Sequence, residues 1–106
     1  MTRPLTDRER SVLDALLSVD VDGVAELRRE ARRTVVSGTC GCGCPSIEFR
    51  PGTGMCVMVN ATVAGSFDSL FLYLIDGELG GIEWVGVSDD VPTELPEPAR
   101  LTISPA

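Results

Sequence analysis

The sequence predicts an α+β fold, in which two N-terminal helices pack on an antiparallel sheet of four to five strands and an irregular, proline-rich tail follows. Apolar residues recur with helical spacing up to about residue 33, and β-branched or alternating segments replace them from residue 34. An Asp-Gly pair at positions 76 and 77, a preferred sequence for a two-residue hairpin turn, separates two apolar runs. A chain of 106 residues with this organisation is expected to form one domain.

The first helix is predicted over residues 6–18. Its start is a capping box, because the Thr6 hydroxyl can accept from the amide of Glu9 while the Glu9 carboxylate reaches back. The apolar residues after it form one stripe of Val12, Leu13, Leu16 and Leu17. The second helix is predicted over residues 22–33, and its buried side consists of Val24, Leu27 and Ala31.

The second predicted helix carries a cluster of arginines, namely Arg28, Arg29, Arg32 and Arg33. Two interpretations are open. In the first, Glu26 and Glu30 form ion pairs with the arginines, and the cations stabilise the negative end of the helix dipole. In the second, the cluster binds phosphate or a partner protein. The first interpretation accounts for most of the cluster.

The sheet is predicted over residues 34–87, with strands at residues 34–37, 46–50, 55–64, 69–75 and 78–87. A regular hairpin around the Asp-Gly turn pairs Ile75 with Glu78, Leu74 with Leu79, Tyr73 with Gly80 and Phe71 with Ile82. An aromatic ring is therefore expected over or beside each strand glycine.

Two further expectations concern the connections. If the turn at residues 51–54 pairs Arg50 with Met55, then Phe49 faces Cys56. The acidic tail, residues 88–106, is expected to be extended and without regular structure, because it contains Pro92, Pro96, Pro98 and Pro105. Three apolar residues could hold it to the core, namely Leu95, Leu101 and Ile103.

The charge is distributed unevenly along the chain, which has a net charge of −7. Residues 1–50 balance eight arginines against eight acids, whereas residues 51–106 set Arg100 alone against eight acids. The acidic second half disfavours nucleic acid and anionic membranes as partners and favours a basic one. No apolar run is long enough to span a membrane and no signal peptide precedes the first helix, so the sequence predicts a cytoplasmic protein with reduced cysteines.

Three cysteines alternate with glycines in the stretch Cys40-Gly41-Cys42-Gly43-Cys44. On a flat strand the three thiols would point the same way but lie about 6.5 Å apart, too far for two sulfurs on one zinc ion. Positive φ angles at the glycines could instead curl the loop around zinc or copper. Disulfide exchange, or a tight connection whose thiols do no chemistry, are the alternatives.

A fourth metal ligand is difficult to find, because the chain contains no histidine. Cys56 is the obvious candidate, but regular hairpin geometry keeps it away from the other three cysteines and places it among apolar side chains. The lack of histidine also excludes a Ser-His or Cys-His catalytic set, and neither a Walker loop nor a GxGxxG motif is present. Enzyme activity is therefore not expected.

The stretch Cys40-Gly41-Cys42-Gly43-Cys44-Pro45-Ser46, with the arginine-rich helix before it and the hairpin and acidic tail after it, resembles small proteins of actinobacteria and their phages. Those proteins have no known activity, so the resemblance implies no ligand and no catalytic residue.

The sequence as a whole favours a small, acidic, non-enzymatic protein that acts as a protein-interaction or accessory module. Its candidate partner-binding residues are the four arginines of the second helix and Trp84. The alternative function is binding of zinc or copper by Cys40, Cys42 and Cys44. A monomer and a homodimer are both compatible with the sequence.

Overall fold

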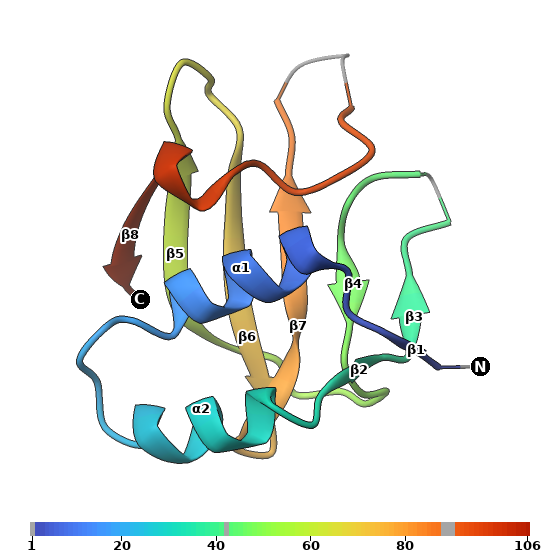
Figure 1. The fold of residues 1–106 in the computed structure, drawn as a ribbon, viewed down its shortest axis with the longest axis vertical. Coiled ribbons are helices and arrows are strands. Elements are labelled where there is room, and N and C mark those ends of the chain that lie inside the picture. Colours follow the sequence, from blue (N-terminus) through green and yellow to red (C-terminus); the bar gives the residue numbers. More distant parts are fainter. Residues whose placement is uncertain (1, 42, 88–90) are drawn as a thin grey trace.

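A computed structural model describes residues 2–41, 43–87 and 91–106 (Figure 1). In chain order its elements are β1 (Arg3–Pro4), α1 (Asp7–Leu16), α2 (Val24–Ala31), β2 (Val35–Val36), β3 (Gly38–Thr39), β4 (Ile47–Glu48), β5 (Cys56–Val63), β6 (Ser69–Ile75), β7 (Glu78–Val85), the 3-10 helix η1 (Pro98–Arg100) and β8 (Leu101–Pro105). The main sheet has six antiparallel strands in the order β3-β4-β7-β6-β5-β8, and β1 pairs with β2 in a separate two-stranded sheet. The α+β prediction is confirmed, and the main sheet has more strands than predicted.

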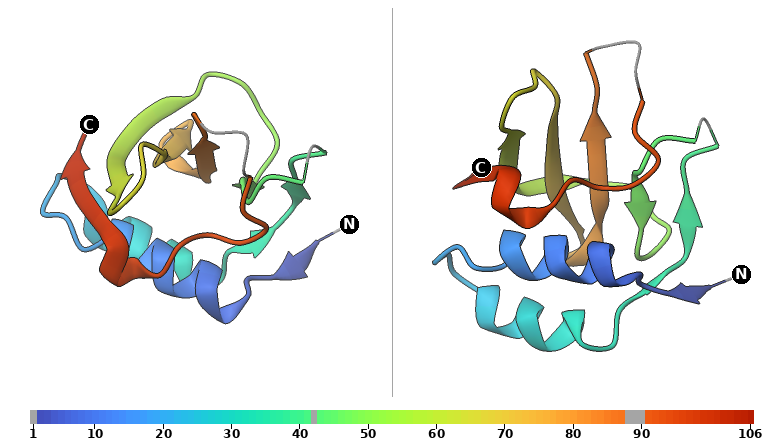
Figure 2. Two further views of the ribbon diagram at one scale, coloured as in Figure 1. Left: turned by 90° about the horizontal axis from the view of Figure 1, so that it is seen from above. Right: turned by 45° about the horizontal axis from the view of Figure 1, so that its top comes forward.

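Both helices lie on the same side of the curved main sheet (Figure 2). α1 begins at the predicted capping box, in which the Glu9 amide donates to Thr6 Oγ1 and the Thr6 amide donates to Glu9 Oε1. The apolar stripes predicted for the two helices are buried against Val59, Leu72 and Ile82 of the central strands. This single core fixes the helices over β5, β6 and β7.

The hairpin of β6 and β7 follows the predicted register only next to its turn. Ile75 pairs with Glu78 and Leu74 with Leu79, as predicted, but Tyr73 then pairs with Gly81 and Phe71 with Glu83. One extra residue in β7, Gly80, causes this shift, which is a β-bulge. The Tyr73 ring covers both glycines, since a Cβ atom on either would lie within 2.8 Å of a ring atom. The prediction that an aromatic ring lies over these glycines is therefore confirmed.

The predicted pairing of residues 46–50 with residues 55–64 is wrong. β4 pairs with β3 and β7, and the chain then crosses the face opposite the helices to reach β5 (Figure 2). Phe49 continues along β7, because its amide donates to the carbonyl of Gly80 at 2.8 Å. Arg50 then contacts β7 and α2: it donates to the Leu79 carbonyl at 3.0 Å and forms ion pairs with Glu30 and Glu78. These contacts favour β7 over β5 as the partner of β4.

The tail contains regular structure, contrary to the prediction. β8 forms the edge of the main sheet, and Pro105 is tolerated there because it pairs with Val59 at a position that donates no hydrogen bond to β5. Leu95 is 1% exposed and belongs to the core, while Leu101 and Ile103 pack against it, as expected. The tail therefore closes one end of the core and completes the sheet.

Candidate functional site

A hollow lies at the end of the sheet where β5 turns into β6 and where β7 ends. It has a volume of about 620 Å³, and we call it the Trp84 pocket. Its walls come from α1, from the β5–β6 turn, from β7 and from residues 91–97, which cross the helix side of the sheet beside α1 (Figure 1). Four separate parts of the chain therefore meet around one concave surface, which is typical of a binding site.

Residues 91–97 are held in place by two anchors. Leu95 is buried in the core, and its carbonyl accepts from Arg8 Nη1 at 3.0 Å. The carboxylates of Glu94 and Glu97 lie 3.6 Å and 3.8 Å from the same guanidinium group. Arg8 thus fixes this wall of the Trp84 pocket to α1, and its own charge is balanced by the two carboxylates.

Asp68 forms the opposite wall and is 8% exposed. Its Oδ1 accepts from the Val87 amide at 2.9 Å, and its own amide donates to Ser66 Oγ at 3.0 Å. The carboxylate therefore connects the β5–β6 turn to the segment after β7. Buried carboxylates with such a role are usually structural, but here the carboxyl group also lines the pocket.

Trp84 provides a buried donor without an acceptor in the described part of the chain. Among the side chains of the described residues, its Nε1 is the only buried nitrogen or oxygen without a hydrogen-bond partner. The backbone around it is well fixed, since the Trp84 amide donates to Ser46 Oγ at 2.8 Å. An unsatisfied buried N–H costs about 1–3 kcal/mol. A ligand in the Trp84 pocket that offers an oxygen to Nε1 would recover that cost.

Exposed apolar side chains gather at this end of the sheet. We define the apolar rim as four of them, namely Phe67 (93% exposed), Val85 (40%), Val87 (66%) and Val91 (51%), of which Val91 lines the Trp84 pocket. Phe67 lies in the connection after β5, Val85 is the last residue of β7, and Val87 and Val91 follow β7, so all four lie at the same end of the antiparallel sheet. Phe67 is not among the binding residues predicted from the sequence, although a lone aromatic residue in the polar turn Gly65-Ser66-Phe67-Asp68 is an available signal.

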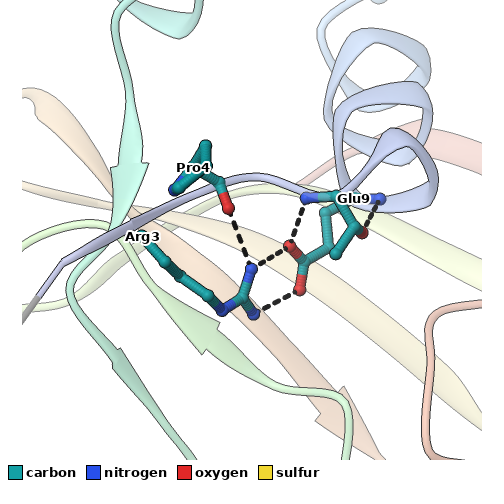
Figure 3. Close-up of polar contacts among 4 residues, drawn as sticks. Arg3, Pro4 and Glu9 are labelled. Carbon is teal, nitrogen blue, oxygen red and sulfur yellow. Dashed lines mark hydrogen bonds and ion pairs between the residues drawn. The ribbon is translucent and has the colours of Figure 1, made fainter.

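A smaller hollow of about 360 Å³ lies on the other side of residues 91–97, and Arg3 and Glu9 line it. Arg3 donates to both carboxylate oxygens of Glu9, at 2.8 Å and 2.9 Å, and also to the carbonyl of Pro4 (Figure 3). These bonds from Arg3, followed by the Thr6 amide, hold the pKa of Glu9 below its ordinary value. Glu9 is fully engaged, so its role is structural rather than acid–base.

The described residues on either side of Cys42 form a bend and not a strand. The Gly43 amide donates to the Cys40 carbonyl at 3.3 Å, and Gly43 has a φ angle of 89°, which favours glycine. Cys44 is half-buried, and its Sγ lies 3.4 Å from Ser46 Oγ. Cys42 lies outside the described residues. Within the described part of the chain, no three His, Cys, Asp or Glu side chains form a group that could hold a metal ion.

Cys56 is separated from this bend by β6 and β7, which lie between β4 and β5 in the sheet. It is exposed at the start of β5, so the expected apolar surroundings are wrong. Cys56 is distant from the other described cysteines, as expected, but the reason is the strand order and not the geometry of a hairpin. The predicted metal site therefore remains a prediction for Cys40, Cys42 and Cys44.

The arginines of the second helix do not form the expected intrahelical ion pairs. Glu30 pairs with Arg50 at 3.1 Å, and none of the ion pairs in the described residues involves Glu26. Arg28 donates from Nε to the carbonyl of Leu17 at 2.7 Å, which satisfies the C-terminal end of α1. Its neighbours Arg29, Arg32 and Arg33 are exposed.

Trp84 and these arginines do not belong to one surface. α2 lies beside the start of β7, where the Leu79 amide donates to Glu30 Oε2 at 3.1 Å, whereas Trp84 lies near the other end of that strand. The residues predicted to bind a partner therefore divide into two separate regions (Figure 1).

None of the helices in the described residues is both long enough and apolar enough to cross a bilayer. The structural features that point to a function are the Trp84 pocket, the apolar rim and the arginines of α2. In comparisons with known proteins, no family model, no curated protein and no solved structure matches the chain.

Proposed function

We propose that the protein is a non-enzymatic interaction module whose Trp84 pocket binds a basic segment of a partner protein. The observation that carries this proposal is the buried Nε1 of Trp84, which has no acceptor among the described residues although the surrounding polar groups are satisfied. A backbone carbonyl of an extended segment is a suitable acceptor for it. Tryptophan residues are frequent hot spots of protein interfaces because they combine a large apolar surface with one donor.

Charge supports a basic partner. The lining of the Trp84 pocket has three acidic residues, Asp68, Glu94 and Glu97, and two basic residues, Arg8 and Arg100. Arg8 already forms ion pairs with the two glutamates. The sequence adds two more acids, Asp89 and Asp90, between β7 and this wall. A lysine or arginine side chain of a partner would therefore enter a favourable potential.

The apolar rim supports a protein rather than a small metabolite as the ligand. Phe67 is 93% exposed, and a fully exposed aromatic side chain loses its unfavourable contact with water when it inserts into a partner. Val91, which lines the Trp84 pocket and is 51% exposed, would extend the same contact. A second copy of this chain is a poor occupant, because each copy has a net charge of −7.

The experiment uses the single tryptophan as a natural probe. A random peptide library displayed on phage is selected on the protein, and the selected peptides are titrated into ¹⁵N-labelled protein. We expect peptides rich in Lys or Arg with an apolar residue, and a saturable downfield shift of the one indole N–H resonance as it gains an acceptor. Selected peptides that bind without moving this resonance would contradict the proposal.

Three variants make the test specific. Trp84→Phe removes the N–H but keeps an aromatic ring, and Phe67→Ser removes the exposed ring at no cost to the core. Each should weaken binding about tenfold or more. Met55→Ser is the matched control, because Met55 is also an exposed apolar residue (52%) but lies at the opposite end of β5. Equal affinities of Phe67→Ser and Met55→Ser would remove the rim from the interface.

A further inference from the structure

The outer side of the helix pair contains a second hollow, which is separate from the Trp84 pocket. It has a volume of about 530 Å³ and is lined by Arg10, Asp14, Leu17, Arg28 and Arg32. The arginines come from two helices that run antiparallel to each other (Figure 1). We propose that this arginine hollow binds a phosphoryl group, either as inorganic phosphate or as the monoester of a small molecule.

Two of the three guanidinium groups are positioned before any ligand binds. Arg28 Nε donates to the Leu17 carbonyl at 2.7 Å, and Arg10 Nη1 donates to the carbonyl of Ala31. Each arginine is thus held by the C-terminal end of the opposite helix. A guanidinium has five N–H donors, so one such bond leaves most of them for a ligand. Because the side chains are already ordered, a ligand would not have to supply the cost of fixing them.

None of these three charges has a carboxylate partner among the described residues. Every ion pair in the described part of the chain involves Arg3, Arg8 or Arg50, and none involves an arginine of this hollow. Asp14 lines the hollow but forms no ion pair there. Three positive charges against one negative charge match a dianion, in a protein whose net charge is −7.

A phosphoryl group fits these donors better than a nucleic-acid backbone does. Guanidinium groups bind phosphate oxygens through paired N–H bonds, and a phosphate monoester concentrates nearly two negative charges on three oxygens. Its field acts over a Debye length of about 8 Å, so it meets mainly the local arginines. A polyanion would extend over the acidic surface of the rest of the molecule and be repelled.

The test follows the arginine Nε–Hε resonances of ¹⁵N-labelled protein at constant ionic strength. Inorganic phosphate and glycerol 3-phosphate are titrated separately, and a single-stranded oligonucleotide is the third probe. We expect saturable shifts of the Arg28 resonance with one or both phosphates, and tighter binding of glycerol 3-phosphate identifies a monoester as the ligand. The Trp84 indole resonance should not move, so this result is independent of the proposed peptide binding.

Arg32→Gln removes one guanidinium from the hollow, and Arg29→Gln is the matched control, because it removes the same charge from the same helix outside the lining residues. Arg32→Gln should weaken phosphate binding about tenfold or more, and Arg29→Gln less than threefold. Equal losses in the two variants, or shifts that do not saturate, would mean an adventitious ion only and would overturn the proposal. Tighter binding of the oligonucleotide than of either phosphate would overturn it in favour of a nucleic-acid interface.

Discussion

Glu9 joins the first strand to the first helix through a single carboxylate. Its oxygens accept from Arg3 and from the Thr6 amide, and its side chain is only 11% exposed. The hydrogen bonds from Arg3 lower the pKa of Glu9 from the ordinary value of 4.5. A lowered pKa in the folded state means that the stability from this carboxylate is present above pH 4.5 and is lost as the pH falls through the lowered pKa.

We predict that Glu9→Gln lowers the free energy of unfolding by about 1 kcal/mol at pH 7, since glutamine keeps the capping geometry but loses the charge paired with Arg3. Urea unfolding followed by Trp84 fluorescence at pH 7 and pH 3 measures the difference, which should shrink at the lower pH. Glu26→Gln is the control, because Glu26 is exposed and forms no ion pair with the described residues. A gap that persists at pH 3 would mean that the charge is not its cause.

The cysteines provide a second test at this scale. We expect protein purified without a tag under reducing conditions to hold less than one equivalent of zinc or copper, because the chain offers three neighbouring thiols, no histidine, and Cys56 two strands away. Elemental analysis gives the stoichiometry. A full equivalent that Cys44→Ser removes and Cys56→Ser retains would instead establish Cys40, Cys42 and Cys44 as a metal site.

Among the elements, the bulged hairpin of β6 and β7 depends on Gly81. A Cβ atom at this position would lie 2.5 Å from both the Ile47 carbonyl and Tyr73 Oη, so the two neighbouring strands approach it as closely as glycine allows.

We therefore predict that Gly81→Ala destabilises the protein by about 2–3 kcal/mol, because either β4 or the Tyr73 ring must move. The control is Gly41→Ala, where a Cβ atom would meet nothing within 4 Å and the change should stay within about 0.5 kcal/mol. Urea unfolding of the two variants is the measurement. Similar stabilities would show that the close approach at Gly81 is relaxed at little cost.

Local signals in the sequence predict local structure well in this chain. The capping box places the start of α1, and the Asp-Gly turn fixes the first two pairs of the β6–β7 hairpin. The partner of β4 could not be predicted in this way, because it depends on tertiary contacts of Arg50 and Phe49 with β7. The Trp84 pocket could not be predicted from the sequence for the same reason, because Arg8 and Leu95, which join two of its walls, are 87 positions apart.

The edge strand β8 was also not predicted, yet its one proline, Pro105, has a role there. The amides of β8 that point away from β5 belong to Leu101 and Ile103, since Pro105 has none. The Leu101 amide already donates to the Pro98 carbonyl of η1. The open side of the edge therefore offers one free donor, at Ile103, which makes it a poor template for another strand.

We predict that the protein is monomeric, with a mass near 11.3 kDa in analytical ultracentrifugation at concentrations up to about 100 µM. Pro105→Val restores a second donor to the edge and should promote strand pairing between copies, seen as concentration-dependent dimerisation. Thr102→Val changes a side chain of β8 without adding a donor and is the control. Equal masses for all three proteins would show that the edge does not limit association.

Over the whole molecule, charge separates the two proposed binding regions. The Trp84 pocket and the acidic residues that line it lie at one end of the sheet, while the arginine hollow lies on the outer side of the helices, away from the sheet. Contacts of α2 with β7 and of η1 with α1 connect the two regions through the same core. The two proposed ligands are oppositely charged and would bind without competing for a surface.

Residues 91–105 follow every other described strand of the sheet in the sequence and are therefore synthesised after those strands. A nascent chain that ends before them has β5 without its outer neighbour and lacks one wall around the indole. Such an intermediate would present a bare strand edge, which chaperones recognise, but no complete recognition surface. Competence to bind a partner would therefore arise only when the final strand docks.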